Sequence, residues 1–140
     1  ITSRQMARAK TTAQKIKDQF DVDVVPIQAF SSSDRAVAIE SAEVVVAAGA
    51  TGIELLRAEH WQENKILQMI ADANATPPLG IGGVEMMDRG LDRAGKKSWG
   101  AIGFGTLKLA LHRACIARLF ESNRLVLDAE EIFEIAKTMA

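Results

Sequence analysis

Several features are scarce or missing in this sequence. A single cysteine among 140 residues excludes an internal disulfide and a cysteine-based zinc cluster, and is typical of a reducing compartment. No apolar run approaches the roughly 20 residues that cross a bilayer, and the N-terminal stretch lacks the apolar core of a signal peptide. The 17 Lys and Arg residues balance 18 Asp and Glu residues, so no net charge attracts nucleic acid or anionic membrane. These absences favour a cytoplasmic protein that recognises its partners at local sites.

The hydrophobic content is 48%, which is enough for a sizeable core. We therefore expect residues 1–140 to form one globular domain. The first residue is Ile1 rather than methionine, which we interpret as a cut in a longer protein.

Apolar spacing predicts helices and strands that alternate along the chain. Ser3 is the expected N-cap of the first helix, and Pro26 places the first full strand at a sheet edge because proline cannot donate a ladder hydrogen bond. The run of residues 44–48 is typical of a strand buried on both faces. The expected helices cover residues 4–20, 36–41, 53–65, 106–121 (largely buried) and a last one capped by Asp128; the expected strands cover 21–27, 43–48, 66–71 and 99–103, with a long loop at 72–98.

This alternation predicts an α/β fold: a Rossmann-like parallel sheet with helices on both faces, in the strand order 3-2-1-4-5-6. In that order, residues 1–3 form the carboxyl end of strand two, and residues 21–27 form strand three at an edge. The first strand and its G-x-G-x-x-G turn do not occur in these residues.

The end of strand two is the expected cofactor-selecting position. NAD-binding sheets place an acidic residue there, whereas small polar residues and arginine accommodate the 2′-phosphate of NADP. This chain has Thr2, Ser3 and Arg4, next to the free N–H groups of a helix start, which suits a phosphate. The alternative, equally weighted, is that Ser3 only caps the helix and Arg4 is only a solvated residue.

Three further segments are candidate sites. The turn containing Gly49 and Ala50 follows a buried strand where α/β sheets bind ligands, although the turn taken alone favours a plain strand-to-helix connection. Asp72 and Asn74 carry hydrogen-bonding groups just before a loop, over residues 77–83, whose prolines and glycines suit a ring-shaped ligand; the alternative is a long structural loop. Lys108, one helical turn before His112, opposes the helix dipole and implies a nearby anion.

No catalytic carboxylate pair, metal-ligand spacing or nucleophile elbow occurs, so we assign no catalytic residue and no metal site. Hydride transfer needs none of them, because the nicotinamide cofactor carries the chemistry and the protein orients it.

Longer strings carry a family resemblance. Residues 72–83, 107–117, 119–122 and 128–132 resemble the C-terminal half of bacterial NADP-dependent methylene-tetrahydromethanopterin dehydrogenases. The resemblance implies hydride transfer from methylene-tetrahydromethanopterin, and in some members methylene-tetrahydrofolate, to NADP during one-carbon (formaldehyde) oxidation in methylotrophs. It also implies a homo-oligomer and an N-terminal pterin-side half as the missing partner.

Carried onto this chain, the resemblance assigns the cofactor and a substrate-side loop to specific positions. Without its N-terminal half this chain should be inactive. Two alternatives stay open: a methylene-tetrahydrofolate dehydrogenase of related fold, and a non-catalytic nucleotide-binding or assembly module. The implied residues are Thr2, Ser3 and Arg4 at the 2′-phosphate; Ala48, Gly49 and Ala50 at the nucleotide; Asp72 and Asn74 at the nicotinamide; and Pro77, Pro78, Leu79, Gly80 and Lys108 on the substrate side.

Overall fold

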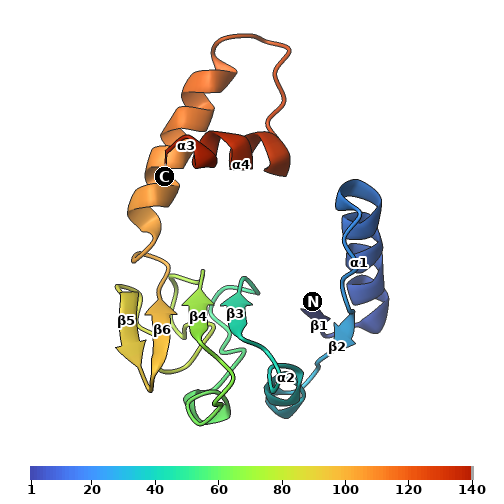
Figure 1. The fold of residues 1–140 in the computed structure, drawn as a ribbon, viewed down its shortest axis with the longest axis vertical. Helices are drawn as coiled ribbons and strands as arrows, with labels where there is room; N and C mark the ends of the chain where they lie inside the picture. Colours follow the sequence, from blue (N-terminus) through green and yellow to red (C-terminus); the bar gives the residue numbers. More distant parts are fainter. Residues whose placement is uncertain (140) are drawn as a thin grey trace.

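The computed structural model describes residues 1–139 and has a mixed α/β architecture with parallel strands and four α-helices (Figure 1). Strands β1 and β2 form a small parallel sheet, and the other strands form a second sheet in the order β3-β4-β6-β5. The predicted fold class, a Rossmann-like α/β fragment, is confirmed at this level. The elements are β1 (Thr2–Ser3), α1 (Met6–Phe20), β2 (Ile27–Gln28), α2 (Ser32–Ala38), β3 (Val44–Ala47), η1 (Ala58–His60), β4 (Met69–Asp72), β5 (Arg89–Arg93), β6 (Lys96–Trp99), α3 (Gly105–Leu119) and α4 (Ala129–Lys137).

The N-terminal unit is a β1-α1-β2 crossover. Helix α1 buries Ala9 and Ala13 and packs on both strands. Its N-cap is Gln5, without a side-chain cap, so the prediction of Ser3 as the cap is wrong; the Ser3 hydroxyl instead accepts a hydrogen bond from the Gln5 N–H. Strand β2 is shorter than predicted because Asp21 is the left-handed C-cap of α1 and Lys17 binds both Asp21 and Asp23, which keeps these residues at the helix end.

The second sheet begins with two parallel strands in register, Val44 opposite Met69 and Ala47 opposite Asp72. Strand β6 pairs parallel to β4, and its other edge pairs with the preceding strand β5 in antiparallel orientation. The β5–β6 hairpin lies inside the predicted long loop, so the loop prediction is wrong over residues 89–98. The strand predicted at residues 99–103 instead forms at Lys96–Trp99. Ala94 and Gly95 have φ of 51° and 76°, the left-handed conformation of a two-residue hairpin turn.

The predicted helix over residues 53–65 is also wrong. Only the short helix η1 forms there, because the backbone before it pairs with the loop after β4: the N–H groups of Leu55 and Leu56 donate to the Gly80 carbonyl. The Gly82 N–H donates back to the Leu56 carbonyl at 2.8 Å. These long-range hydrogen bonds take the groups that a helix would have paired locally.

The core includes Ala47 of β3 and Ile70 of β4. It surrounds Trp61, which is fully buried. The Trp61 indole N–H donates to the Gly82 carbonyl at 2.9 Å, so its polar edge is satisfied inside the apolar cluster. The buried members of the cluster are Ile39, Ala47, Leu56, Trp61, Leu67, Ile70, Ile81 and Val84.

Strand β3 departs from the predicted burial. Val44 and Val46 are 54% and 65% exposed, whereas the apolar run predicted a strand covered on both faces. The physical reason is that Val44 and Val46 lie on one face of the strand, which no described element covers, whereas Val45 and Ala47 on the other face are more buried. Strand β3 is also an edge strand, paired only with β4. Its apolar composition suits a central strand, and the described residues supply a neighbour on one side alone.

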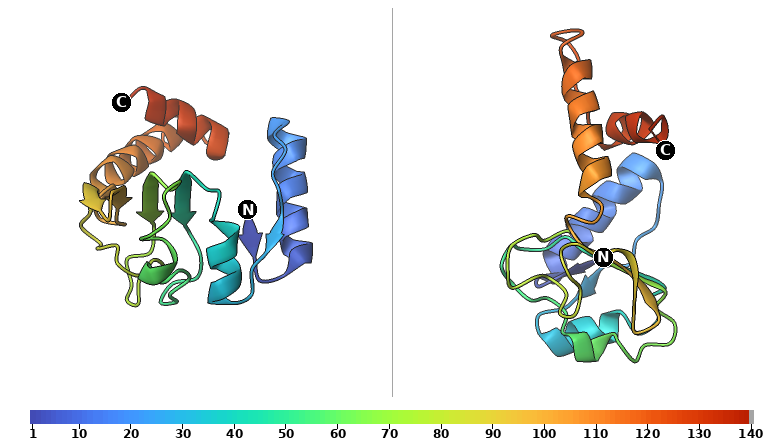
Figure 2. Two further views of the ribbon diagram at one scale, coloured as in Figure 1. Left: turned by 60° about the horizontal axis from the view of Figure 1, so that its bottom comes forward. Right: turned by 90° about the vertical axis from the view of Figure 1, so that its left-hand side faces the viewer.

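Helices α3 and α4 form an arm that rises from the end of β6, as Figure 1 and the right panel of Figure 2 show. They pack on each other, and Asp128 caps α4 in the predicted capping box with Glu131. The prediction that α3 is largely buried is wrong, because it projects away from the sheet and buries only Cys115. Among residues 1–139, no helix is long and apolar enough to cross a membrane.

Candidate functional site

The carboxyl ends of β3 and β4 bring three of the predicted segments together. The strands run parallel with Ala47 beside Asp72, and the Ala73 N–H extends the ladder to the Ala47 carbonyl at 2.9 Å. The turn of Ala48, Gly49 and Ala50 therefore leaves the sheet beside Asp72. All three turn residues are exposed, which leaves their backbone open to a ligand at the edge where open α/β sheets bind one.

Asp72 is 1% exposed, and its carboxylate is committed to its own loop. Oδ2 accepts from the Ile81 N–H at 2.8 Å, and Oδ1 accepts from the Asn74 N–H at 2.9 Å. A buried carboxylate is stable only with such partners. In this structure Asp72 therefore acts on the shape of the loop that carries Gly80, rather than reaching out toward solvent.

Gly80 lies against Asp72. A Cβ added there would stand 2.9 Å from Asp72 Oδ1 and 3.4 Å from the Ala47 Cβ, so only glycine lets the loop approach the strand ends this closely. Gly49 has a weaker constraint, because an added Cβ would meet a terminal methyl of the flexible Leu55 side chain at 2.5 Å. Both predicted glycines thus allow close packing where the two strands end.

Asn74 leaves one polar atom without a partner. Its Oδ1 accepts from the Thr76 N–H at 3.1 Å, whereas its buried Nδ2 has no hydrogen-bond partner among the described residues. An unpaired buried amide group is costly, and its donor is available to a ligand or a water molecule. Pro77 and Pro78 follow, joined by a cis peptide bond, and both are exposed.

Thr2, Ser3 and Arg4 lie in the other sheet, at the carboxyl end of β1. Arg4 is exposed, and its backbone carbonyl accepts from the Gln28 side chain at 3.2 Å. Helix α1 begins two residues later with no acidic side chain in its first turn and no side-chain cap. A guanidinium, two hydroxyls and free helix N–H groups form a donor set that suits a phosphate.

Lys108 is exposed in the first turn of α3, which also holds no acidic residue. His112, one turn later, is exposed as well. His60 is more enclosed: its Nδ1 lies 3.3 Å from the Ser32 hydroxyl, and its Nε2 lies 3.5 Å from Glu59. The first of these contacts joins α2 to η1, and the second lies within η1.

Sequence reasoning missed a buried polar cluster centred on Asp88, which is 1% exposed. Its carboxylate binds the Arg93 guanidinium, accepts from the Ser98 hydroxyl at 2.7 Å and accepts from the Glu85 N–H at 3.0 Å. Hydrogen bonding by Arg93, then by Ser98 and Glu85, lowers the pKa of Asp88 to about 2 against the opposing effect of burial. The Ala94-Gly95 turn signal could have revealed the hairpin that brings Arg93 and Ser98 together.

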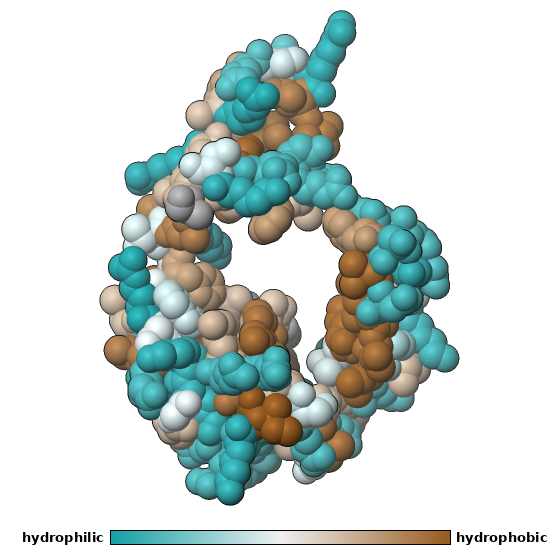
Figure 3. Space-filling model, in the orientation of Figure 1, coloured by the Kyte–Doolittle hydropathy of each residue, from teal (hydrophilic) through white to brown (hydrophobic). Residues whose placement is uncertain are grey.

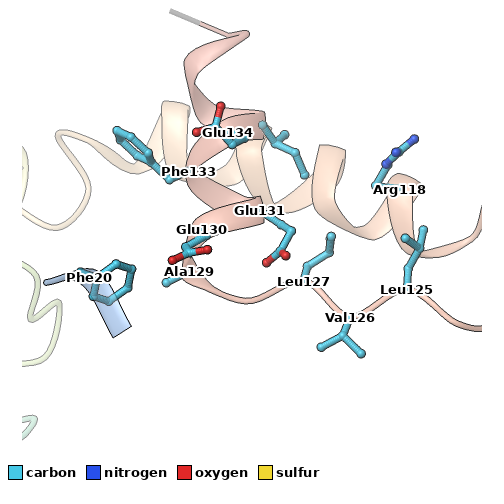
Figure 4. A pocket seen from close by; sticks show the side chains of 11 residues that line it. Phe20, Arg118, Leu125, Val126, Leu127, Ala129, Glu130, Glu131, Phe133 and Glu134 are labelled. Carbon is cyan, nitrogen blue, oxygen red and sulfur yellow. The ribbon is translucent and has the colours of Figure 1, made fainter. Parts of the chain in front are cut away.

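A separate open hollow lies between the end of α1 and the arm (Figure 4). Phe20 approaches from α1, while Val126, Leu127 and Phe133 come from α4 and the loop before it. None of the predicted site residues lines this hollow. It is an apolar surface between elements, and we assign no ligand to it.

The parallel strands, with small residues and a buried aspartate at their carboxyl ends, place the chain in the Rossmann-like class of α/β proteins. No protein-family model matches it. It is 45% identical, over all 140 of its residues, to the bifunctional protein MdtA of Methylorubrum extorquens. It is 28% identical over 136 residues to the NAD(P)-dependent methylenetetrahydromethanopterin dehydrogenase of the same organism. The chain spans about half the length of these curated relatives, 49% and 46% respectively.

Proposed function

We propose that this chain is the nicotinamide-nucleotide-binding part of a dehydrogenase that passes a hydride from methylene-tetrahydromethanopterin to NADP. The observation that carries the proposal is similarity to two proteins, one along the whole chain and the other, which is named for that substrate, along 136 of its residues. The Rossmann-like architecture supports it independently, because its strand ends form the edge at which nucleotides bind.

In this proposal the chain binds and orients the cofactor, and the nicotinamide ring supplies the hydride-accepting carbon. Arg4, with Thr2 and Ser3, holds the 2′-phosphate at the start of α1. The exposed turn of Ala48, Gly49 and Ala50 lies against the nucleotide. Asp72 fixes the following loop, so that the unpaired Asn74 amide and the exposed prolines face the nicotinamide and the pterin. Lys108 lies on the substrate side, and the working protein is a homo-oligomer in the cytoplasm.

The test uses a hybrid protein, defined as the MdtA relative with its matched region replaced by this chain. We expect the hybrid to reduce NADP when given methylene-tetrahydromethanopterin, followed as absorbance of the reduced nicotinamide. A clear preference for NAD, or no reduction by either nicotinamide, would contradict the proposal. Faster reduction with methylene-tetrahydrofolate would instead favour the related folate dehydrogenase, and NADP binding without reduction would favour a non-catalytic nucleotide-binding module.

The 2′-phosphate assignment has its own test. In the hybrid, Arg4→Ala should weaken NADP binding by about 1.5–3 kcal/mol, because a charged hydrogen bond is lost, and should leave NAD binding nearly unchanged. Arg8→Ala is the matched control, since Arg8 is also exposed near the start of α1 and its loss changes the net charge equally. Equal losses for NADP and NAD would show that Arg4 does not bind the 2′-phosphate.

A further inference from the structure

The direction of α3 is set where the helix leaves the sheet. Helix α3 packs mainly on α4, and the space-filling view shows an opening through the molecule below the arm, so the arm does not lie flat on the sheet (Figure 3). The described residues therefore fix the direction of α3 largely at its root, defined as residues 100–104, which connect β6 to α3.

The root is bound to a turn that ends at Asp88. The Gly100 N–H donates to the Asp88 carbonyl at 2.9 Å. The N–H groups of Ile102 and Gly103 both donate to the Met86 carbonyl, at 2.9 and 3.1 Å. Three backbone hydrogen bonds therefore attach the root to this one turn.

Two glycines allow the root and the turn to touch. A Cβ added at Gly103 would stand 1.6 Å from the Asp88 carbonyl oxygen, and one added at Gly100 would stand 2.0 Å from another carbonyl oxygen of the turn. Because these neighbours are backbone atoms, no side-chain movement could relieve the clash. Helix α3 begins at Gly105, whose N–H donates to the Ile102 carbonyl at 2.9 Å. A displacement of the turn would therefore reach the start of the helix.

The Asp88 side chain holds the turn itself. Its carboxylate accepts from the Glu85 N–H at 3.0 Å, and the Asp88 N–H donates to the Glu85 carbonyl at 3.0 Å. The same carboxylate binds Arg93 of β5 and accepts from the Ser98 hydroxyl of β6. Charge-assisted hydrogen bonds of this kind fix geometry as well as contributing free energy. The β5–β6 hairpin thus determines where the turn lies, and the turn determines where the root lies.

We propose that the Asp88 cluster, defined as Asp88, Arg93 and Ser98, is a positioning element for the first turn of α3. That turn carries Lys108, which the proposed function places on the substrate side, so the inference deepens the proposed function and rests on it. The cluster itself contacts neither cofactor nor substrate; it holds the helix start so that Lys108 meets the pterin in a fixed position. A misplacement of about 1 Å near a reacting centre can cost on the order of 100-fold in rate.

Amide hydrogen exchange in the 140-residue chain reports on the root directly. Asp88→Asn should release the turn that accepts from the Ile102 and Gly103 amides. Their exchange should then become at least about ten-fold faster relative to that of Ile70 in β4. Lys96→Met is the matched control, because it removes a different buried contact of the hairpin, from the Lys96 ammonium to two backbone carbonyls, and should leave this ratio unchanged. An unchanged ratio in Asp88→Asn would overturn the proposal.

Kinetics of the hybrid test the consequence for the reaction. Asp88→Asn should lower kcat for NADP reduction at least about ten-fold. It should change the Kd of NADP by less than about two-fold, because the proposed 2′-phosphate site at Arg4 lies in the other sheet. Lys96→Met should keep the wild-type kcat. A wild-type kcat in Asp88→Asn would overturn the proposal, and so would equal losses in the two variants, since general destabilisation would then explain both.

A double-mutant cycle in the hybrid tests whether Asp88 acts through Lys108. Lys108→Met removes the ammonium that the cluster is proposed to position. Adding Asp88→Asn to that variant should lower kcat by less than about two-fold, because the displaced group is already absent. A full additional loss would overturn the proposal, because a purely structural role of Asp88 would cost the same with or without Lys108.

Gly103→Ala disturbs the same contact from the side of the root. It leaves the Asp88 carboxylate and its partners unchanged, but the added methyl group forces the root away from the turn. The variant should reproduce the loss of kcat, and it keeps the proposal falsifiable if Asp88→Asn does not fold. A folded Gly103→Ala hybrid with the wild-type kcat would overturn the positioning role.

The outcomes for positioning and for function are separable. A wild-type hybrid that does not reduce NADP would contradict the proposed function, while the exchange ratio would still decide whether the Asp88 cluster holds the root. A wild-type hybrid that reduces NADP, together with an equally active Asp88→Asn hybrid, would sustain the proposed function and overturn the positioning role.

Discussion

The segment from Ile39 to Trp99 and the arm of α3 and α4 differ sharply in what they bury. The first surrounds Trp61 with apolar side chains and satisfies the buried Asp72 and Asp88. The second is rich in leucine and isoleucine, yet within α3 and α4 it buries only Cys115. Both are apolar in sequence, so composition alone does not make a core. A core also needs a second apolar surface to pack against. The described residues supply such a surface to the segment from Ile39 to Trp99 but not to the arm.

The largest effect is expected at the centre of the buried region. Trp61→Ala should destabilise the chain by about 3–5 kcal/mol, because it removes the largest buried side chain and leaves a cavity. Denaturant unfolding followed by circular dichroism measures the loss. Phe120→Ala is the matched aromatic truncation, since Phe120 is 87% exposed. Similar losses in the two variants would mean that the two regions do not differ as described.

Asp88 makes the stability of the buried region depend on pH. Its pKa of about 2 in the folded chain is lower than the ordinary 3.8. As the pH falls, the unfolded chain therefore binds a proton at Asp88 before the folded chain does. The resulting stabilisation, on the order of 2 kcal/mol, is complete above pH 4 and is lost as the pH falls through 2. Unfolding of the wild type and Asp88→Asn should therefore differ most near neutrality and converge in acid. A constant difference across this range would contradict the assignment to Asp88.

In the arm, the strongest local feature is the capping box of α4. Asp128→Ala should speed amide exchange at Glu130 and Glu131 roughly several-fold, because the N-cap acceptor is lost. Exchange in β4 and β6 should not change, since the arm and the sheet open separately. Faster exchange in the sheet as well would show that the arm is part of one cooperative core.

The smallest effect is expected at the exposed end of the arm. Phe120→Ala should change the free energy of unfolding by less than about 0.5 kcal/mol, as is usual for exposed positions. It should also reduce any self-association of the isolated chain, measured by sedimentation, because it removes an exposed aromatic ring. A loss comparable to that of Trp61→Ala would place Phe120 in a packed interface.

Local patterns predicted the elements whose stability is local. The periodicity of α1 and the Asp128–Glu131 capping box are both present in the structure, because each depends on residues within a turn or two. The parallel pairing of residues 2–3 with residues 27–28 was also foreseen, from strand order.

The wrong predictions at residues 53–65 and 89–98 share one cause, which is pairing with distant residues. Residues 53–57 have a helical pattern, but Gly80 takes the N–H groups of Leu55 and Leu56. The valines of β3 have the composition of a central strand, although the described chain pairs them on one side only. At the candidate site, sequence identified Asp72 and Asn74, but not that Asp72 binds its own loop. The cluster of Asp88, Arg93 and Ser98 depends on a hairpin that the charged residues of that segment concealed.

Amide hydrogen exchange along the 140-residue chain tests the central contrast most directly. The account predicts the slowest exchange at Ile70 and Ser98, which are fully buried in β4 and β6, and exchange faster by orders of magnitude at Val46 and through α3. Uniform protection from β3 to α4 would contradict it, because the arm and the edge strand β3 would then belong to the same stable core as Trp61.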